Sequence, residues 1–89
     1  MSESILRVVN PLGLHARPAA KVVDCASRFS SEITLRFNGR EIDAKSIMSV
    51  LMLAAGQGSE IILNISGEDE TAARDAMETL FNSGFGELE

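Results

Sequence analysis

The residue best suited to chemistry in this sequence is His15, the only histidine in the chain. It follows a strand-breaking Pro11-Leu12-Gly13 segment and precedes an amphipathic stretch that starts at Ala16. A neutral imidazole can act as a nucleophile near physiological pH. His15 is therefore the first candidate for a covalent, group-transferring role.

The start of the predicted helix at Ala16 offers a place for an anion. No Ser, Thr, Asp or Asn stands directly before Ala16, so backbone N–H groups at this end lack an obvious side-chain cap. The helix dipole adds about half a positive charge there, and Arg17 adds a planar guanidinium that suits phosphate oxygens. Pro18 fits a first helical turn, and Gly13 allows a tight turn before it. The pattern predicts that Ala16 and Arg17 hold a phosphoryl group on His15, in a field that disfavours the imidazolium form.

Metal binding and nucleotide-dependent catalysis fit the sequence less well. A zinc site needs three or four converging ligands, whereas this chain has one His and one Cys, Cys25, well apart along the sequence. The sequence also lacks a Gly-x-x-x-x-Gly-Lys-Ser/Thr loop and the kinase motifs. We therefore expect no metal, no cofactor, a structural thiol at Cys25, and a phosphoryl donor held by another protein. Non-covalent binding of an anionic metabolite at the His15 loop is a weaker alternative.

Length and charge limit the remaining functions. The 89 residues are 45% hydrophobic, which predicts a single domain spanning residues 1–89. A formal net charge of −5 would repel nucleic acid and anionic membranes. No apolar run approaches the ~18 residues that span a bilayer, and no signal peptide is evident. We expect a cytoplasmic protein that neither binds nucleic acid nor inserts into membranes.

The hydrophobic pattern predicts the element order β-α-β-β-α-β-α. Alternating or β-branched runs predict strands at residues 5–9, 32–37, 40–44 and 61–65, with a hairpin at Asn38-Gly39. Apolar residues at helical spacing predict helices from Ala16, after Ser46 as far as Ala54, and from an acidic first turn at 68–70. One antiparallel sheet with all helices on one face buries these stripes most simply.

The segment Asn10-Pro11-Leu12-Gly13-Leu14-His15-Ala16-Arg17-Pro18-Ala19 resembles the active-site signature of the HPr family. These are the histidine-containing phosphocarriers of the bacterial phosphoenolpyruvate-dependent phosphotransferase system. The resemblance covers residues 5–85 and implies an α+β fold, an open-faced β-sandwich. Its four-stranded antiparallel sheet would have the order 1-4-2-3, with three helices on one face.

The resemblance also implies roles for residues and partners. His15 would accept a phosphoryl group on Nδ1 from phosphorylated enzyme I and pass it to a histidine of a IIA-type protein, assisted by Arg17. The chain would then be a covalent carrier and not a stand-alone enzyme. We expect it to act as a monomer.

Two roles are open for Ser46. A serine at this position can cap the following helix, which usually stabilises a protein by ~1 kcal/mol. Lys45-Ser46-Ile47-Met48 is also similar to the regulatory serine segment of the family, which implies phosphorylation by an HPr kinase/phosphorylase. A regulatory module governed by Ser46 phosphorylation alone is the main alternative to a phosphocarrier.

A docking surface is expected beside the two helix starts, which we expect to lie near one another. Met48 and part of Ile47 should be exposed as an adaptable apolar contact. Arg17, Lys21 and Lys45 should rim this contact and suit partners with acidic surfaces. The expected docking residues are Ala20, Lys21, Ile47, Met48 and Leu51.

Two segments point to different branches of the family. The tail at residues 80–87 resembles the nitrogen-related branch, whereas residues 45–48 resemble members controlled by HPr kinase. The sequence therefore leaves open whether the phosphoryl group serves sugar uptake or regulation.

Overall fold

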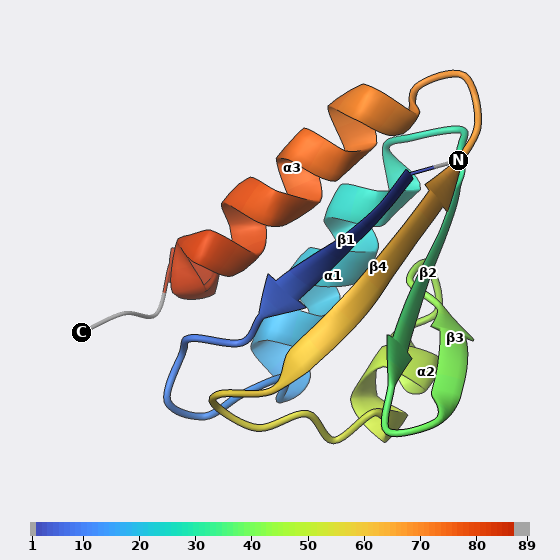
Figure 1. The fold of residues 1–89 in the computed structure, drawn as a ribbon. Helices are drawn as coiled ribbons and strands as arrows, with labels where there is room; N and C mark the ends of the chain where they lie inside the picture. Colours follow the sequence, from blue (N-terminus) through green and yellow to red (C-terminus); the bar gives the residue numbers. More distant parts are fainter. Residues whose placement is uncertain (1, 87–89) are drawn as a thin grey trace.

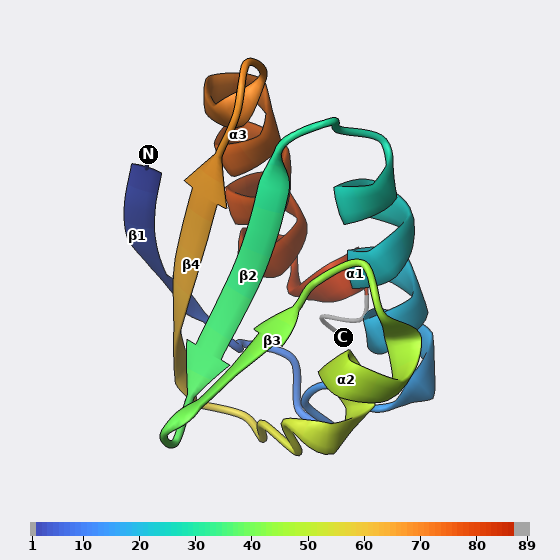
Figure 2. The same cartoon turned by 90° about the vertical axis from the view of Figure 1, so that its right-hand side faces the viewer.

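The architecture is a four-stranded antiparallel sheet covered on one face by three helices, described for residues 2–86 in the computed structural model (Figures 1 and 2). The strand order is β1-β4-β2-β3, which confirms the predicted topology. The strands are β1 (Ser2–Arg7), β2 (Glu32–Phe37), β3 (Arg40–Asp43) and β4 (Glu60–Ser66). The helices are α1 (Ala16–Ser27), α2 (Ile47–Met52) and α3 (Glu70–Asn82), followed by the short 3-10 helix η1 (Gly84–Gly86).

The register of the sheet places its apolar side chains on the helix-covered face. Leu6 of β1 lies opposite Ile61 of β4, and Leu35 of β2 lies opposite Leu63 of β4. All four side chains are buried. Because side chains alternate along a strand, this register leaves Thr34 and Arg36 of β2 on the open face, together with the apolar pair Ile5 and Ile62.

Strand β1 differs from the prediction, which placed it at residues 5–9. The polar residues Ser2, Glu3 and Ser4 also pair with β4, whereas the strand ends at Arg7. Backbone pairing with a neighbouring strand does not require apolar side chains, so hydrophobic pattern alone missed this start. The early end lets the chain turn toward His15.

The helices pack closely on the sheet through small or well-fitted side chains. On α1 the buried residues include Ala19, Val22 and Ala26, and on α3 they include Met77 and Phe81. At the end of α3, Gly84 has a φ of 65°, and the chain returns so that the Phe85 ring meets that of Phe81 edge to face at 4.8 Å. This return is the predicted C-terminal cap with its hydrophobic contact.

Helix α2 is shorter than the sequence predicted. It ends at Met52, and Ala54 has a φ of 53° and lies outside the helix. Leu53 and Ala55 on either side are both buried. The reversal at Ala54 therefore turns both neighbours inward, although a left-handed conformation costs an alanine roughly 1–2 kcal/mol.

At the end of the sheet farthest from His15, Asp69 joins two loops that are distant in sequence (Figure 1). Its carboxylate accepts hydrogen bonds from the Ser30 N–H at 2.9 Å, the Ser31 N–H at 3.0 Å and the Ser31 hydroxyl. These bonds, that of the Ser31 hydroxyl first, lower the pKa of Asp69 to about 2. Of the three acidic residues predicted to form the first turn of α3, Glu70 alone lies in it. Asp69 makes no side-chain cap and binds the other loop instead.

The hydrogen bonds from Ser30 and Ser31 to the Asp69 carboxylate, which we call the Asp69 clamp, predict a specific sensitivity of the fold to acid. Folding stabilises the ionised form of the Asp69 carboxyl, since its pKa is lower in the folded protein than in the unfolded chain. This contribution to stability is complete above pH 3.8 and is lost as pH falls through about 2. In Asp69→Asn this part of the pH dependence should disappear, and the variant should be less stable than the wild type at pH 6. Urea unfolding across this pH range measures both effects.

Glu68→Gln is the matched control, because Glu68 is exposed in the same loop. It should retain the wild-type pH profile. A parallel profile for wild type and Asp69→Asn would contradict the clamp.

Candidate functional site

His15 is the N-cap residue of α1. Its backbone is extended, with φ −81° and ψ −171°, and its carbonyl accepts the Ala19 N–H at 2.9 Å. The side chain of His15 makes no capping hydrogen bond to α1. The first turn of α1 contains no acidic side chain. Ala16 and Arg17 are exposed and His15 is half-buried. The positive end of α1 is therefore directed to a surface where an anion attached to His15 could meet it.

The loop before His15 is held by the connection between α2 and β4, and the two segments lie side by side at the lower end of Figure 1. The Leu14 N–H donates to the Ala55 carbonyl at 2.9 Å. Gly13, with a φ of 68°, lies so close to this segment that a Cβ atom there would be 2.5 Å from the Ala55 oxygen. Sequence reasoning missed this support, because no local pattern links Gly13 to a residue 42 positions later.

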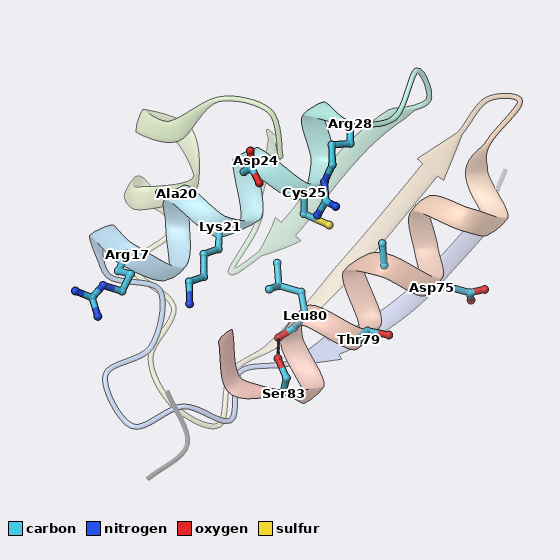
Figure 3. Close-up of a pocket in the computed structure, with 11 residues that line it drawn as sticks. Arg17, Ala20, Lys21, Asp24, Cys25, Arg28, Asp75, Thr79, Leu80 and Ser83 are labelled. Atoms are coloured by element: carbon cyan, nitrogen blue, oxygen red, sulfur yellow. Dashed lines mark hydrogen bonds between the residues drawn. The ribbon is translucent and has the colours of Figure 1, made fainter. Parts of the chain in front are cut away.

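The three cations predicted to rim the apolar contact of α2 have different surroundings. Arg17 is exposed at the start of α1, and its side chain extends away from the helix body (Figure 3). The Lys21 ammonium donates to the Phe85 carbonyl at 2.5 Å, which ties α1 to η1. The Lys45 ammonium donates to the Phe29 carbonyl at 2.8 Å, just beyond the end of α1.

The Lys45 ammonium lies far from His15. Twelve residues of α1 span about 18 Å, so the Lys45 ammonium lies at the opposite end of that helix from His15. The start of α2 is thus tied to the end of α1 instead of its start. The long, flexible lysine side chain reaches a backbone carbonyl whose position no local sequence pattern indicates.

Helix α2 presents apolar side chains to solvent. Met48 is 64% exposed and Ile47 is 39% exposed, as expected, whereas Leu51 is partly buried against the core. Met52, at 61%, and Leu12, at 74%, are also exposed and were not predicted. Leu12 could have been found from its place between Pro11 and Gly13, because a turn leaves little to cover its side chain.

Ser46 caps α2, as predicted. Its hydroxyl oxygen accepts the Ser49 N–H at 3.4 Å, which is at the long end of hydrogen-bond distances. The residue is half-buried. Ser46 therefore has a structural role in the fold, whatever else acts on it.

A groove separates α1 from α3 (Figure 3). Arg17 and Arg28 stand along its α1 side, and Asp75 lies on its α3 side. Cys25 and Leu80 also line it, and burial raises the pKa of the Cys25 thiol. His15 does not line this groove, so we place the candidate site at the loop and not here.

The described residues offer neither a metal cluster nor a membrane-spanning helix. Across residues 2–86, no group of three or more His, Cys, Asp or Glu side chains is placed to hold a metal ion. The same residues contain no helix with the length and apolar character needed to cross a membrane.

Comparisons with known proteins agree with one another. The family model described as "PTS HPr component phosphorylation site" matches residues 2–83. The chain is 52% identical over 87 residues to the phosphocarrier protein HPr of Xylella fastidiosa, covering 98% of each chain. A crystal structure of HPr from Thermoanaerobacter tengcongensis, 42% identical, superposes with a TM-score of 0.95 over the whole of both chains. A crystal structure of an HPr dimer from the same organism, 42% identical, gives a TM-score of 0.79 over 98% of this chain and 100% of that one.

The contact between Gly13 and Ala55 generates a prediction about stability. In Gly13→Ala the added methyl would meet the Ala55 carbonyl, so the loop must shift, and the left-handed backbone adds its own cost. We expect the free energy of unfolding to fall by roughly 2 kcal/mol or more, measured by urea denaturation.

Gly39→Ala separates the two causes. Gly39 has a φ of 82°, but nothing lies within 4 Å of the position its Cβ would occupy. This control should therefore lose only the conformational part, roughly 1 kcal/mol. Equal losses in the two variants would show that the Ala55 contact is unimportant.

Proposed function

The chain belongs to the HPr family of phosphocarrier proteins of the phosphotransferase system, and from this membership we propose that His15 is its phosphoryl-carrying residue. His15 would receive the group on Nδ1 from phosphorylated enzyme I and pass it to a IIA-type protein. The single observation that carries the proposal is the position of His15 at the uncapped, positively polarised start of α1.

The proposed transfer exchanges one P–N bond for another. The Nδ1 lone pair of neutral His15, with its proton on Nε2, attacks phosphorus while the bond to the donor histidine breaks. The bond electrons return to the donor imidazole, so no water, metal or oxidant is consumed. The second transfer repeats this exchange in the opposite sense, with His15 as the leaving group. In-line displacement of this kind depends mainly on positioning and on stabilising charge.

Helix α1 supplies that stabilisation in the proposal. The N–H groups of Ala16 and Arg17 belong to the first turn, where an α-helix provides them with no partner of its own. The exposed Arg17 guanidinium can turn toward phosphate oxygens and form charge-assisted bonds.

Partner docking would use the exposed side chains of Met48 and Ile47 on α2. Ala20 and Lys21 on α1 and part of Leu51 would complete the docking surface.

The first test is phosphorylation by enzyme I and phosphoenolpyruvate. The wild type should gain one acid-labile phosphoryl group, and His15→Ala should gain none, because the chain has no other histidine. Arg17→Lys keeps the charge but loses the planar fork, so it should be phosphorylated about tenfold or more slowly. Mass spectrometry before and after acid treatment measures the adduct.

Lys45→Gln is a suitable control for charge, because its ammonium lies at the other end of α1. It should be phosphorylated at the wild-type rate if charge matters only near His15. Acid-labile phosphate on His15→Ala would refute the assignment.

A second proposed function concerns Ser46. Its hydroxyl is half-buried at the start of α2, directly before the exposed Ile47 and Met48. A phosphoryl group added there by an HPr kinase/phosphorylase would place negative charge on the proposed docking surface and hinder partners with acidic surfaces.

The same arrangement would serve a carrier in sugar uptake or in nitrogen-related regulation. We propose a monomer as the working form, because the carrier must leave one partner to meet the next.

Two Ser46 variants separate capping from regulation. Ser46→Ala should lower the free energy of unfolding by about 0.5 kcal/mol, since the capping bond is long, and should leave phosphorylation by enzyme I unchanged. Ser46→Asp keeps an acceptor for the helix start and adds charge, so it should remain stable while phosphorylation by enzyme I slows. Urea unfolding and initial phosphorylation rates measure the two effects. If Ser46→Asp accepts phosphate as fast as wild type, the regulatory role fails.

A further inference from the structure

Asn10 is a buried polar residue in the loop that precedes His15. Its side chain is 0% exposed, and among residues 2–86 the buried polar or charged residues are Asn10 and Ser31. Burying an amide costs free energy unless hydrogen bonds replace its contacts with water. The partner of the Asn10 amide group therefore indicates what the loop requires.

The Asn10 amide binds the Gly13 carbonyl, which also accepts a hydrogen bond from the His15 backbone. The Asn10 Nδ2 group donates to the Gly13 carbonyl at 2.8 Å. The same carbonyl accepts the His15 N–H at 2.9 Å, and the Gly13 N–H donates back to the Asn10 carbonyl at 3.2 Å. Asn10 thus binds both the N–H and the carbonyl of Gly13, and the Gly13 carbonyl is shared between the Asn10 side chain and the His15 N–H.

The opposite side of the His15 backbone is fixed as well. Its carbonyl accepts the Ala19 N–H in the first turn of α1. With the N–H held through Gly13 and the carbonyl held through Ala19, the imidazole can move only by its own side-chain torsions. Small displacements of a reacting group can cost about a hundredfold in rate, so this fixation matters for transfer.

We propose that Asn10 is a positioning residue for phosphoryl transfer, acting on His15 through the Gly13 carbonyl. The proposal rests on the proposed role of His15 and extends it to a residue that never touches the phosphoryl group. Asn10 sets the direction of the Gly13 carbonyl, the carbonyl sets the His15 N–H, and the imidazole is thereby presented at the start of α1.

The variant Asn10→Ala removes the side-chain donor. We expect kcat for phosphorylation by enzyme I, with this protein as the varied substrate, to fall about tenfold or more while KM changes less than about twofold. KM should be preserved because the exposed side chains of α1 and α2 are untouched. In the unphosphorylated variant, the His15 amide should exchange its hydrogen at least about tenfold faster relative to the Ala19 amide.

Ser31→Ala is the matched control. Ser31 is also buried, at 2%, but its hydroxyl binds Asp69 at the other end of the sheet. This variant should lose stability while keeping wild-type kcat and the wild-type His15 amide exchange. An equal loss of kcat in Ser31→Ala and Asn10→Ala would reduce Asn10 to a purely structural role and overturn the proposal.

A second variant and a measurement on the unmodified wild type complete the test. Asn10→Asp preserves the side-chain shape but replaces the donor with an oxygen, and should reproduce the kinetic loss. In the unmodified wild type, NMR couplings across hydrogen bonds should join both the Asn10 side-chain amide and the His15 amide to the Gly13 carbonyl carbon. Their absence would overturn the proposal without any variant. If the wild type were never phosphorylated on His15, the proposed function would fail, while the couplings and amide exchange would still report on Asn10.

Discussion

The contact on which the candidate site depends is the approach of the Gly13 backbone to the Ala55 carbonyl. It leaves no room for a Cβ atom, and the adjacent Leu14 N–H donates to the same oxygen. The loop before α1 is thereby fixed against the segment that joins α2 to β4. Because that segment is itself anchored by the buried side chains of Leu53 and Ala55, the hydrophobic core reaches the loop through backbone contact. A reactive side chain can then stand at the surface on a rigid support.

The electrostatics of the site run against those of the whole molecule. The chain carries a net charge of −5, yet the start of α1 has no acidic side chain in its first turn and has Arg17 beside it. The net negative charge of the protein repels anions in general, whereas the positive region at the start of α1 favours an anion at that one place. Of the three cations predicted to meet a partner, Arg17 is exposed at the start of α1, whereas the Lys21 and Lys45 ammonium groups each donate to a backbone carbonyl.

The Asp69 hydrogen bonds and the candidate functional site lie at opposite ends of the sheet (Figure 1). The Asp69 clamp joins the loops at one end, and the loop of His15 occupies the other. Each end contains a buried polar residue whose side chain donates a hydrogen bond: the Ser31 hydroxyl donates to the Asp69 carboxylate, and the Asn10 amide donates to the Gly13 carbonyl. Hydrogen bonds of this kind specify a single loop conformation, since leaving either partner buried and unmatched would cost free energy.

The sequence by itself determined the element order, the strand topology through its family signature, and the choice of His15 as the candidate phosphoryl-carrying residue. These follow from local features: apolar spacing, the Asn38-Gly39 turn, and a lone histidine before an uncapped helix. Only the tertiary structure decided what supports His15, because the close approach of Gly13 to Ala55 and the Leu14 N–H bond to the Ala55 carbonyl join backbone groups far apart in sequence. Backbone carbonyls carry no sequence signal of their own. Asn10 lay within the recognised signature, but its burial and its bond to Gly13 appear only when the loop is folded against its neighbours.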